Sequence, residues 1–311
     1  MQYLLKIDIS GIQTFIFDVP SKGASRQLKA RSVYVQMLTF LAEEFFKNAL
    51  GKIEVLYNGG GNLFFFVESQ EEQIQESIRK FQQDFTTENI FPIVAYVPKN
   101  EDFKVTMQAL AQKANIAKLQ KPLYLHSYDY KPVKEGKWKE ITENLIEATG
   151  FIIKAEEKHT TAHPLSKAGL VLEFSKVGLQ FEGTILNKVP ISKDESITEF
   201  DEIAQKATGD AKLAALKMDV DNLGQLFRNK NQDEYQRNSK VLSEFFEKKI
   251  YEILKEYIKN EYIYPIFSGG DDCFLIGAWD KILEVAGKIQ VSFDKYQKEN
   301  NLHLTLSAGV V

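Results

Sequence analysis

Cysteine and histidine are scarce in this sequence, and long apolar runs are absent. The chain of 311 residues contains 1 cysteine and 4 histidines. A single cysteine excludes a disulfide framework and a thiolate-rich zinc site, and it is consistent with a reducing compartment. No apolar run reaches the length of a membrane span, and the N-terminus starts as a strand rather than as a signal peptide. We therefore expect a cytoplasmic protein without a membrane partner.

Charge and composition narrow the class of protein further. The formal net charge is -4, which argues against a broad, sequence-independent nucleic-acid surface, although local basic patches are compatible with it. Hydrophobic residues make up 44% of the chain and aromatic residues 12%, so a sizeable core can be buried. The length suits about two domains of ordinary size, and the composition predicts a soluble globular protein.

Residues 262–277 have the pattern of a β-hairpin with carboxylates at its tip. Apolar segments at 262–267 and 273–276 flank the turn and predict the two strands. The turn consists of Ser268, Gly269, Gly270, Asp271 and Asp272. Two adjacent acids at a tip are not needed for folding, so they indicate a functional site.

A third acid, Asp219, ends the strand predicted at 213–219. If this strand lies beside the hairpin in one sheet, Asp219 faces Asp271 and Asp272. Two carboxylates about 4 Å apart repel by about 4 kcal/mol at an effective dielectric constant of about 20, so such a cluster favours a bound cation. Mg2+ takes oxygen ligands, and two ions about 3.5 to 4 Å apart hold the attacking and leaving oxygens in nucleotidyl transfer. The alternative is an ordinary turn and a helix-capping aspartate, but the two motifs together favour the metal site.

The order of the predicted elements repeats along the chain. The first half has a strand at 3–9, a helix from about 25, strands at 53–57 and 63–67, a helix at about 71–85 and a strand at 91–97. The second half has a strand at 213–219, a helix at about 240–259, strands at 262–267 and 273–277, a helix at 281–298 and a strand at 302–311. This is the β-α-β-β-α-β order of the ferredoxin-like fold. We predict an α+β protein with two tandem ferredoxin-like palm domains, 1–120 and 206–311, joined by a small α+β connecting domain, 121–205.

The repeat also holds residue by residue. Lys6 to Ile12 align with Lys217 to Leu223, and the 51 positions from Asp8 to Gly59 nearly equal the 50 from Asp219 to Gly269. Where the second copy has Gly269, Gly270, Asp271 and Asp272, the first has Gly59, Gly60, Gly61 and Asn62. The first copy is therefore expected to bind without catalysing. Its glycine turn predicts either a cradle for nucleotide phosphate or a tight hairpin that needs positive φ angles. Asp8 is a vestigial ligand, a hydrogen-bond partner for a ribose, or a structural cap.

Two other segments carry weaker signals. The basic segment 21–31 leads into a helix with Ser25 as its predicted N-cap, and Lys22, Arg26 and Arg31 either hold phosphate or form a solvated basic face. In the middle region, a helical piece near 138–148 and a hairpin at 170–181 are predicted. The histidines of this region, His126, His159 and His163, lack cysteine or paired acidic partners, so we interpret them as ordinary surface or loop residues.

Together these motifs resemble one known family. Asp8 to Gln13, Ser25 to Ser32, Asn58 to Asn62, Asp219 to Gly224 and Ser268 to Asp272 are similar to segments of the large palm-polymerase subunit of type III CRISPR effector complexes, the cyclic oligoadenylate synthetase. The resemblance covers both predicted palms. It implies that two ATP molecules lie between the palms, that the 3′-hydroxyl of one attacks the α-phosphate of the other, and that the oligomer finally closes into a ring.

The resemblance also implies roles for individual residues. Asp219, Asp271 and Asp272 would be catalytic and would hold two Mg2+ or Mn2+ ions, with the Val220 carbonyl as a further ligand. The nucleotide pockets would be shaped by Ser10, Gly59, Gly60, Gly61, Asn62, Asn222, Ser268, Gly269 and Gly270. The implied partners are ATP and the other subunits of a type III effector complex with its guide RNA and target RNA.

The sequence departs from this family in three ways. It opens at the first palm and none of its histidines is followed by aspartate, so DNA cleavage by an HD nuclease domain is not expected. One cysteine cannot form the family's four-cysteine zinc site, and the chain ends at Val311 without the helical C-terminal domain. Two alternatives stay open: a synthetase of cyclic dinucleotides that uses GTP, and a scaffold subunit without enzymatic activity.

Overall fold

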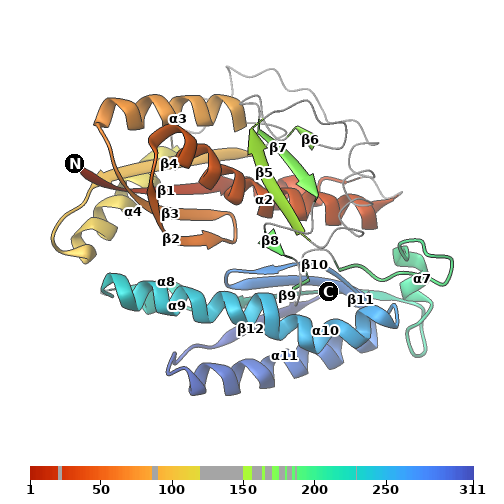
Figure 1. The fold of residues 1–311 in the computed structure, drawn as a ribbon. Helices are drawn as coiled ribbons and strands as arrows, with labels where there is room; N and C mark the ends of the chain where they lie inside the picture. The colour runs from red at the N-terminus through yellow and green to blue at the C-terminus, as the bar shows by residue number, and fades with distance from the viewer. Residues whose placement is uncertain are drawn as a thin grey trace.

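The structure of this protein is a computed structural model, drawn in Figure 1. It describes residues 1–19, 23–85, 90–119, 150–155, 163–164, 170–174, 179–180, 184–185, 188–228 and 230–311. The predicted helical piece at 138–148, His126, His159 and Lys22 lie outside the described residues, and of His163 only the backbone is described. Among the described helices, none combines the length and the apolar character needed to cross a membrane.

The first half forms a four-stranded antiparallel sheet with helices on both faces. Its elements are β1 (Gln2–Ser10), α1 (Ile12–Phe17), α2 (Ala24–Leu50), β2 (Ile53–Gly59), β3 (Asn62–Glu68), α3 (Glu71–Phe85), β4 (Phe91–Pro98) and α4 (Phe103–Leu119). The strand order is β2-β3-β1-β4. One face packs against α2 and α3, and the other packs against α4, which the sequence did not reveal.

The second half forms a second sheet with the equivalent order, β10-β11-β9-β12. Its elements are β9 (Leu213–Val220), α8 (Leu223–Phe227), α9 (Gln232–Glu244), the π-helical segment η1 (Phe245–Lys249), α10 (Ile250–Lys259), β10 (Ile263–Gly269), β11 (Asp272–Ala278), α11 (Trp279–Glu299) and β12 (Leu306–Val310). The predicted order of six elements is therefore present in both halves. The first long helix of this half begins at Gln232 rather than near residue 240, because Asn231 caps it through the backbone N–H of Glu234.

The repeat extends to the strand register. Asp8 lies opposite Asn62 in the first sheet, and Asp219 lies opposite Asp272 in the second. Both second strands also carry an irregularity at the same place, between Val55 and Tyr57 in β2 and between Pro265 and Phe267 in β10. The register shift therefore occurs at equivalent positions of the two halves, and a β-bulge changes the direction in which the following residues point.

The middle region contains a third sheet of short strands, in the order β6-β7-β5-β8. These strands are β5 (Gly150–Ala155), β6 (His163–Pro164), β7 (Leu170–Phe174) and β8 (Leu179–Gln180). The hairpin predicted at 170–181 is wrong, since β7 and β8 do not pair with each other and both pair with β5. Alternation of apolar residues identified the strands, but it carries no information about which partner each strand takes.

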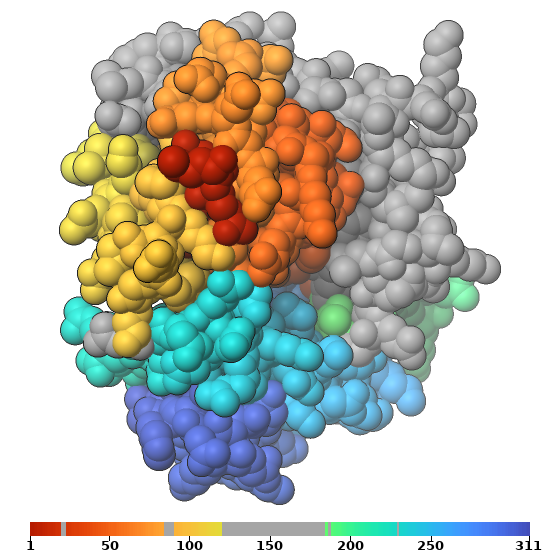
Figure 2. All heavy atoms as spheres, turned by 60° about the vertical axis from the view of Figure 1, so that its left-hand side comes forward, coloured from red at the N-terminus to blue at the C-terminus, as the bar shows by residue number. Residues whose placement is uncertain are grey.

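The two halves pack against each other reciprocally, with the first half above the second in Figure 1. Helix α2 contacts β10, and α9 contacts β2. The core of the first half accordingly includes Tyr264 and Ile266 from β10. Figure 2 shows α4 beside the segment of α8 and α9, where the rings of Phe103 and Tyr235 lie 6.0 Å apart. The contact between the halves therefore includes apolar side chains that are continuous with the core of the first half.

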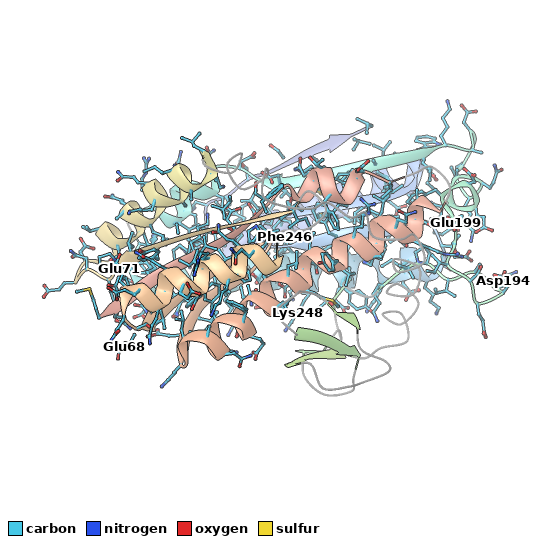
Figure 3. All side chains as sticks on the ribbon, turned by 90° about the horizontal axis from the view of Figure 1, so that it is seen from above. Glu68, Glu71, Asp194, Glu199, Phe246 and Lys248 are labelled. Atoms are coloured by element: carbon cyan, nitrogen blue, oxygen red, sulfur yellow. The ribbon has the colours of Figure 1, made fainter. Side chains whose placement is uncertain are left out.

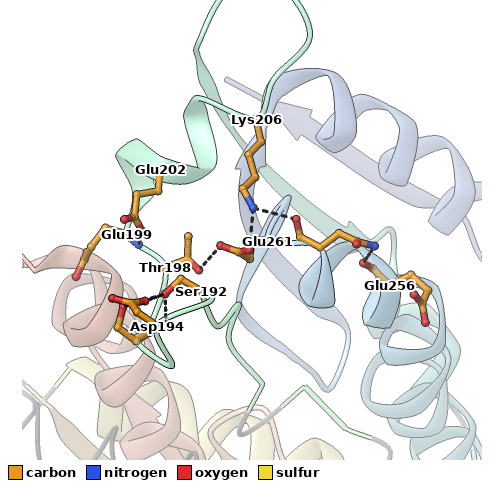
Figure 4. Close-up of polar contacts among 10 residues, drawn as sticks. Ser192, Asp194, Thr198, Glu199, Glu202, Lys206, Glu256 and Glu261 are labelled. Carbon is orange, nitrogen blue, oxygen red and sulfur yellow. Dashed lines mark hydrogen bonds and ion pairs between the residues drawn. The ribbon is translucent and has the colours of Figure 1, made fainter.

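A strap at residues 188–205, which ends in α7 (Phe200–Ala204), ties the halves together. Ser25 donates a hydrogen bond to Glu199. Thr198 donates to Glu261, which also pairs with Lys206 at 2.9 Å (Figure 4). The prediction that Ser25 caps α2 is wrong. Helix α2 begins after Gly23, so the Ser25 hydroxyl is available for this long-range bond.

In the described part of the basic segment, from residue 23 onward, the basic side chains contact other parts of the chain. Arg26 lies 3.7 Å from the Glu199 carboxylate, and Arg31 donates to the Phe15 carbonyl at 2.7 Å. Lys29, at 1% exposure, is buried. Neighbouring parts of the chain therefore contact these side chains, and the sequence-based phosphate hypothesis has no support from their placement.

Candidate functional site between the two hairpin tips

The tips of the β2-β3 and β10-β11 hairpins touch. A Cβ added at Gly270 would lie 3.5 Å from Gly60 Cα, and one added at Gly60 would lie 3.6 Å from Gly270 Cα. The Tyr57 hydroxyl sits beside both tips, 3.2 Å from the Gly270 Cβ position. Gly60 and Gly270 have φ angles of 55° and 68°, which only glycine adopts without strain. The predicted tight hairpin with positive φ angles is thus present in the first half.

Gly270→Ala tests the tip contact. The added methyl group would press on Tyr57 and Gly60, so we expect lower nucleotide affinity as well as a loss of about 1 kcal/mol in folding stability from the strained φ angle. Gly209→Ala is the matched control, because Gly209 has a φ angle of 84° but open space around its Cβ position. Thermal unfolding and titration with ATP should give similar stability losses but a loss of affinity for Gly270→Ala alone. Equal affinities would show that the tip contact is not needed.

The three acids predicted from the sequence gather at the second tip. Asp219 is the second-last residue of β9 and lies opposite Asp272. Asp271 occupies the turn, where its carbonyl accepts from the Val220 N–H at 3.1 Å. Burial raises the pKa of Asp272 to about 7, and the negative charge of Asp271 is the second cause of this rise. Burial also raises the pKa of Asp271, with the negative charge of Asp219 as the second cause. The positive charge of Lys217 opposes the rise in pKa at both carboxyl groups. The ionised forms of Asp271 and Asp272 are therefore disfavoured, because the nearby positive charge does not offset burial and the neighbouring carboxylates.

This donor set suits a hard cation. In the part of the chain that the structure describes, no three acidic, histidine or cysteine side chains lie close enough together to hold a metal ion. Mg2+, however, is usually held by one or two carboxylates together with substrate phosphates and waters, rather than by an all-protein cage. The cross-strand pair of Asp219 and Asp272, with raised carboxyl pKa values beside it, fits that mode of binding.

The equivalent acid of the first half is neutralised by the chain itself. Asp8 pairs with Lys118 of α4 at 2.7 Å and with Lys6 at 3.2 Å. Its cross-strand partner is Asn62, so only one acid remains where the second half has three. Among the three roles considered for Asp8, this ion pairing favours a structural one.

A cavity of about 280 Å³ opens between the two hairpins. Its lining combines apolar side chains of α1 and α2 with polar groups of both tips, namely Ile12, Gln13, Ile16, Ser32, Val35, Gln36, Thr39, Phe40, Asn58, Gly59, Gly60, Gly61, Thr184, Glu247, Phe267, Ser268, Gly269 and Asp272. This volume lies near the lower end of the range for small-molecule sites. A cavity with an apolar wall and an acidic, glycine-rich rim fits a nucleoside attached to phosphates.

Some of the predicted site residues line the cavity and others do not. Gly59, Gly60, Gly61, Ser268, Gly269 and Asp272 line it. Asp219, Val220, Asp271 and Gly270 lie at the same tip but do not line the cavity, and Ser10, Asn62 and Asn222 do not line it either. Asn62 donates to the Gly60 carbonyl, while Asn222, with a φ angle of 56°, begins α8 in the left-handed conformation.

Several residues of the site were missed from the sequence. Lys29 donates to the carbonyls of Pro265 at 3.1 Å and Ile185 at 2.7 Å, and Ser32 donates to the Ile266 carbonyl at 2.9 Å. The carbonyls of Pro265 and Ile266 lie at the β10 bulge, so α2 of the first half holds the strand that leads to the acids. Ser268, two residues after Ile266, donates to the carbonyl of Phe246 in η1. The sequence signal for the burial of Lys29 was its position among apolar residues of the helix. The interpretation of 21–31 as a basic segment did not take this into account.

Two family models match the chain. Residues 1–128 match the model described as Csm1 subunit domain B, and residues 212–311 match the model described as Cas10/Cmr2, second palm domain. Between them these models cover most of the chain, and each covers one of the two halves.

Curated relatives match along nearly the whole chain. It is 25% identical to the CRISPR system single-strand-specific deoxyribonuclease Cas10/Csm1 (subtype III-A) of Streptococcus thermophilus, over 99% of this chain and 49% of the relative. It is 24% identical to the protein of the same name from Methanocaldococcus jannaschii, over 99% of this chain and 53% of the relative. The chain therefore spans about half the length of the curated relatives it matches.

Solved structures share the fold. The Csm1-Csm4 subcomplex of the type III-A CRISPR-Csm interference complex gives a TM-score of 0.81 at 20% identity, covering 100% of this chain and 50% of that chain. A Csm1-Csm4 cassette in complex with one ATP gives 0.79 at 21% identity, covering 100% and 50%. The cassette in complex with cA4 gives 0.77 at 19% identity, covering 99% and 49%.

The second half is thus a palm domain of the kind found in Cas10 and Cmr2 proteins. Each half of the chain matches a family model of Cas10-type proteins, and curated Cas10/Csm1 proteins match along nearly its whole length, which confirms the resemblance found in the motifs.

Proposed function

We propose that this chain is a nucleotidyltransferase that polymerises ATP into cyclic oligoadenylates in type III CRISPR antiviral defence. The observation that carries the proposal is the pair of Asp219 and Asp272 beside a cavity lined by the hairpins of both halves. Structures of the same fold in complex with ATP and with cA4 support nucleotides as ligands. We favour this activity over the deoxyribonuclease activity for which the curated relatives are named, because the acids adjoin a cavity of nucleoside size.

The two halves would divide the work. We propose ferredoxin-like palm domains at 1–120 and 206–311, with 121–205 as the connecting domain. The first palm would bind nucleotide without catalysing, because lysines neutralise Asp8 and Asn62 replaces the second acid. The second palm would carry the chemistry. Other subunits of a type III effector complex, with guide and target RNA, are the proposed partners, which the Csm1-Csm4 subcomplex of the same fold supports.

The chain's own residues would bind and orient the reacting groups. Asp219, Asp271 and Asp272, with the Val220 carbonyl, would hold two Mg2+ or Mn2+ ions together with nucleotide phosphates. Such ions, when bound, favour ionisation of an attacking 3′-hydroxyl and neutralise the charge on the departing pyrophosphate. The glycine tips let backbone amides approach phosphate closely, and the apolar wall of the cavity excludes water from the base. Most of the rate would come from positioning and charge neutralisation.

The experiment that tests this function is incubation of the purified chain with ATP and Mg2+ or Mn2+, followed by mass spectrometry of the products and measurement of pyrophosphate. Cyclic oligoadenylates together with pyrophosphate are the expected result. A parallel incubation with GTP distinguishes the alternative cyclic dinucleotide synthetase, whose product would appear there instead. Absence of both product and metal-dependent ATP binding would overturn the proposal and favour a scaffold subunit.

Metal binding should depend on pH through Asp272. A protonated carboxyl cannot bind a cation, and the pKa of Asp272 is raised to about 7. Its ionised fraction therefore rises from about one tenth at about pH 6 to about nine tenths at about pH 8, and the affinity for Mn2+ should rise roughly tenfold and then level off. Calorimetric titration at about pH 6, 7 and 8 checks this, with Asp272→Asn as the control whose pH dependence should be weaker. The same affinity at every pH would contradict the assignment of Asp272 as a ligand.

A further inference from the structure

A carboxylate that the proposed function does not use lies beside Asp219. Asp221 directly follows β9, two residues after Asp219. Its Oδ1 accepts a hydrogen bond from the Ser307 hydroxyl at 2.6 Å, and its Oδ2 accepts one from the Thr305 hydroxyl at 2.8 Å. The Asp221 N–H also donates to the Thr305 carbonyl at 2.9 Å. Both carboxylate oxygens of Asp221 therefore have hydroxyl donors from the neighbouring strand, and we call these three residues the β12 clamp.

The β12 clamp sets the direction of one hydroxyl group at the edge of the second sheet. Among the described strands, β12 has β9 as its one neighbour, and the two lie side by side at the edge of the ribbon in Figure 3. In their register Ser307 lies directly opposite Asp219, within reach of its carboxylate. Ser307 nevertheless donates to Asp221, its diagonal neighbour. A serine hydroxyl has one proton to donate, so this bond withholds the proton from Asp219.

The carboxylate of Asp219 is left without a donor from the protein. No hydrogen bond or ion pair joins its side chain to another residue in the part of the chain that the structure describes. On the side of β9 away from Ser307, it faces the carboxyl group of Asp272. A hydroxyl proton and a metal ion compete for the same lone pairs of a carboxylate oxygen. The oxygens of Asp219 are therefore available to a cation as long as the Ser307 proton is taken up elsewhere.

The first half gives an internal comparison for the β12 clamp. In the aligned repeat, Ser10 takes the place of Asp221. The neighbouring strand places Phe91 opposite Ser10 and Ile93 opposite Asp8, so it has no hydroxyl group at either position. Because both sheets have the same strand order, the fold itself does not require the clamp. The carboxylate and its two hydroxyl donors occur together in the half that has three acids at its tip.

We propose that Asp221 is a positioning residue, which takes up the Ser307 proton and so keeps the carboxylate of Asp219 open to a cation. This inference rests on the proposed function, because it concerns the cation that Asp219 and Asp272 would hold. Without Asp221, the Ser307 hydroxyl would donate to the facing Asp219, occupy one of its oxygens and draw the carboxylate toward β12, away from Asp272. Because Asp219 and Ser307 are exposed to water, the competing bond would lower cation affinity by only about three- to tenfold.

The test measures the binding of Mn2+ to the purified chain by calorimetry. The variants are Asp221→Ala, Asp221→Asn, Ser307→Ala and the double variant of Asp221→Ala with Ser307→Ala. An asparagine oxygen can still accept the Ser307 proton, and its amide can donate to the Thr305 hydroxyl, so Asp221→Asn keeps the clamp while it removes the charge. Asp219→Asn reports on the proposed metal site itself, and thermal unfolding verifies that each variant is folded.

Asp221→Ala should bind Mn2+ about three- to tenfold more weakly than the unaltered chain, whereas Asp221→Asn and Ser307→Ala should stay within about twofold of it. The double variant should regain the affinity that Asp221→Ala loses, because the competing hydroxyl is gone. A clamp that only stabilised the sheet would instead leave the double variant at least as weak as Asp221→Ala.

Three results would overturn this inference while the metal site stands. Unchanged affinity in Asp221→Ala would show that the Ser307 proton does not matter, and no recovery in the double variant would show that Ser307 does not compete for Asp219. Equal losses in Asp221→Asn and Asp221→Ala would show that the charge of Asp221 acts on the cation directly. Full Mn2+ affinity in Asp219→Asn, or no Mn2+ binding by the unaltered chain, would overturn the proposed metal site and this inference together.

Discussion

Asp219→Asn is expected to lower the rate of cyclic oligoadenylate synthesis by at least about 100-fold. The substitution keeps the shape of the side chain but removes the negative charge that faces Asp272 across the strands. An amide binds a divalent cation far more weakly than a carboxylate does, so both the activation of the 3′-hydroxyl and the neutralisation of pyrophosphate suffer. Initial rates of pyrophosphate release, measured with saturating ATP and Mg2+, give the comparison.

Asp8→Asn is the matched control for this prediction. Asp8 occupies the same position in the repeat, at the end of the first strand and opposite the residue that follows the glycine turn. Because Lys6 and Lys118 already neutralise it, its removal should affect folding stability more than catalysis, with a rate within a few-fold of the unaltered chain. If Asp219→Asn retained the full rate, or if Asp8→Asn lost as much, the assignment of chemistry to the second palm would be wrong.

The second large effect concerns stability rather than chemistry. Between about pH 7 and about pH 9, the free energy of unfolding of the unaltered chain should gain up to about 1.4 kcal/mol per pH unit from Lys29, relative to Lys29→Met. Burial, with a contribution from Lys188, lowers the pKa of the Lys29 ammonium to about 7. Lys29 therefore folds largely as a neutral amine that donates to the carbonyls of Ile185 and Pro265.

The sign of this effect follows from proton binding. Above about pH 7 the folded state has released the Lys29 proton, whereas the unfolded state keeps it up to the ordinary lysine pKa of 10.5. The unfolded state then binds more protons, so stability rises with pH across that window and falls toward neutral pH. Urea unfolding at about pH 7, 8 and 9 measures the slope.

Ser32→Ala is the control for Lys29→Met. It removes a neighbouring hydrogen bond from α2 to β10, to the Ile266 carbonyl, but no titratable group. It should cost about 1 kcal/mol at every pH, with the slope of the unaltered chain preserved. A parallel pH slope in Lys29→Met and the unaltered chain would show that Lys29 stays charged in the folded state.

The sequence was informative where local pattern and the internal repeat agree. Helix α3 matches its predicted bounds, and Asp219 faces Asp272 across the strands as predicted. Asp8 lies opposite Asn62 at the equivalent position of the first half. Part of this success has a local physical basis, because the hairpin turn fixes the register of β10 and β11 and so puts Asp271 and Asp272 at the tip.

Features that depend on contact between the halves were not predictable in this way. The burial of Lys29, the long-range bond of Ser25 and the ion pairing of Asp8 with Lys118 each join segments far apart in the sequence. Glu247 gave one local signal, a charged residue directly after two buried phenylalanines, but its place at the cavity depends on the π-helical turn. Periodicity assumes a uniform helix and cannot place a residue within such a turn.

The ion pairs of Asp8 give the two palms different demands on their surroundings. The first palm carries its counter-ions as side chains, so its tip needs nothing from solution to balance the acid. In the second half, Lys217 is the lysine that opposes the raised pKa values of the Asp271 and Asp272 carboxyls. If the proposed ions bind there, a chelator would remove them and leave the ion pairs of Asp8 intact, so the two tips would differ in their dependence on metal.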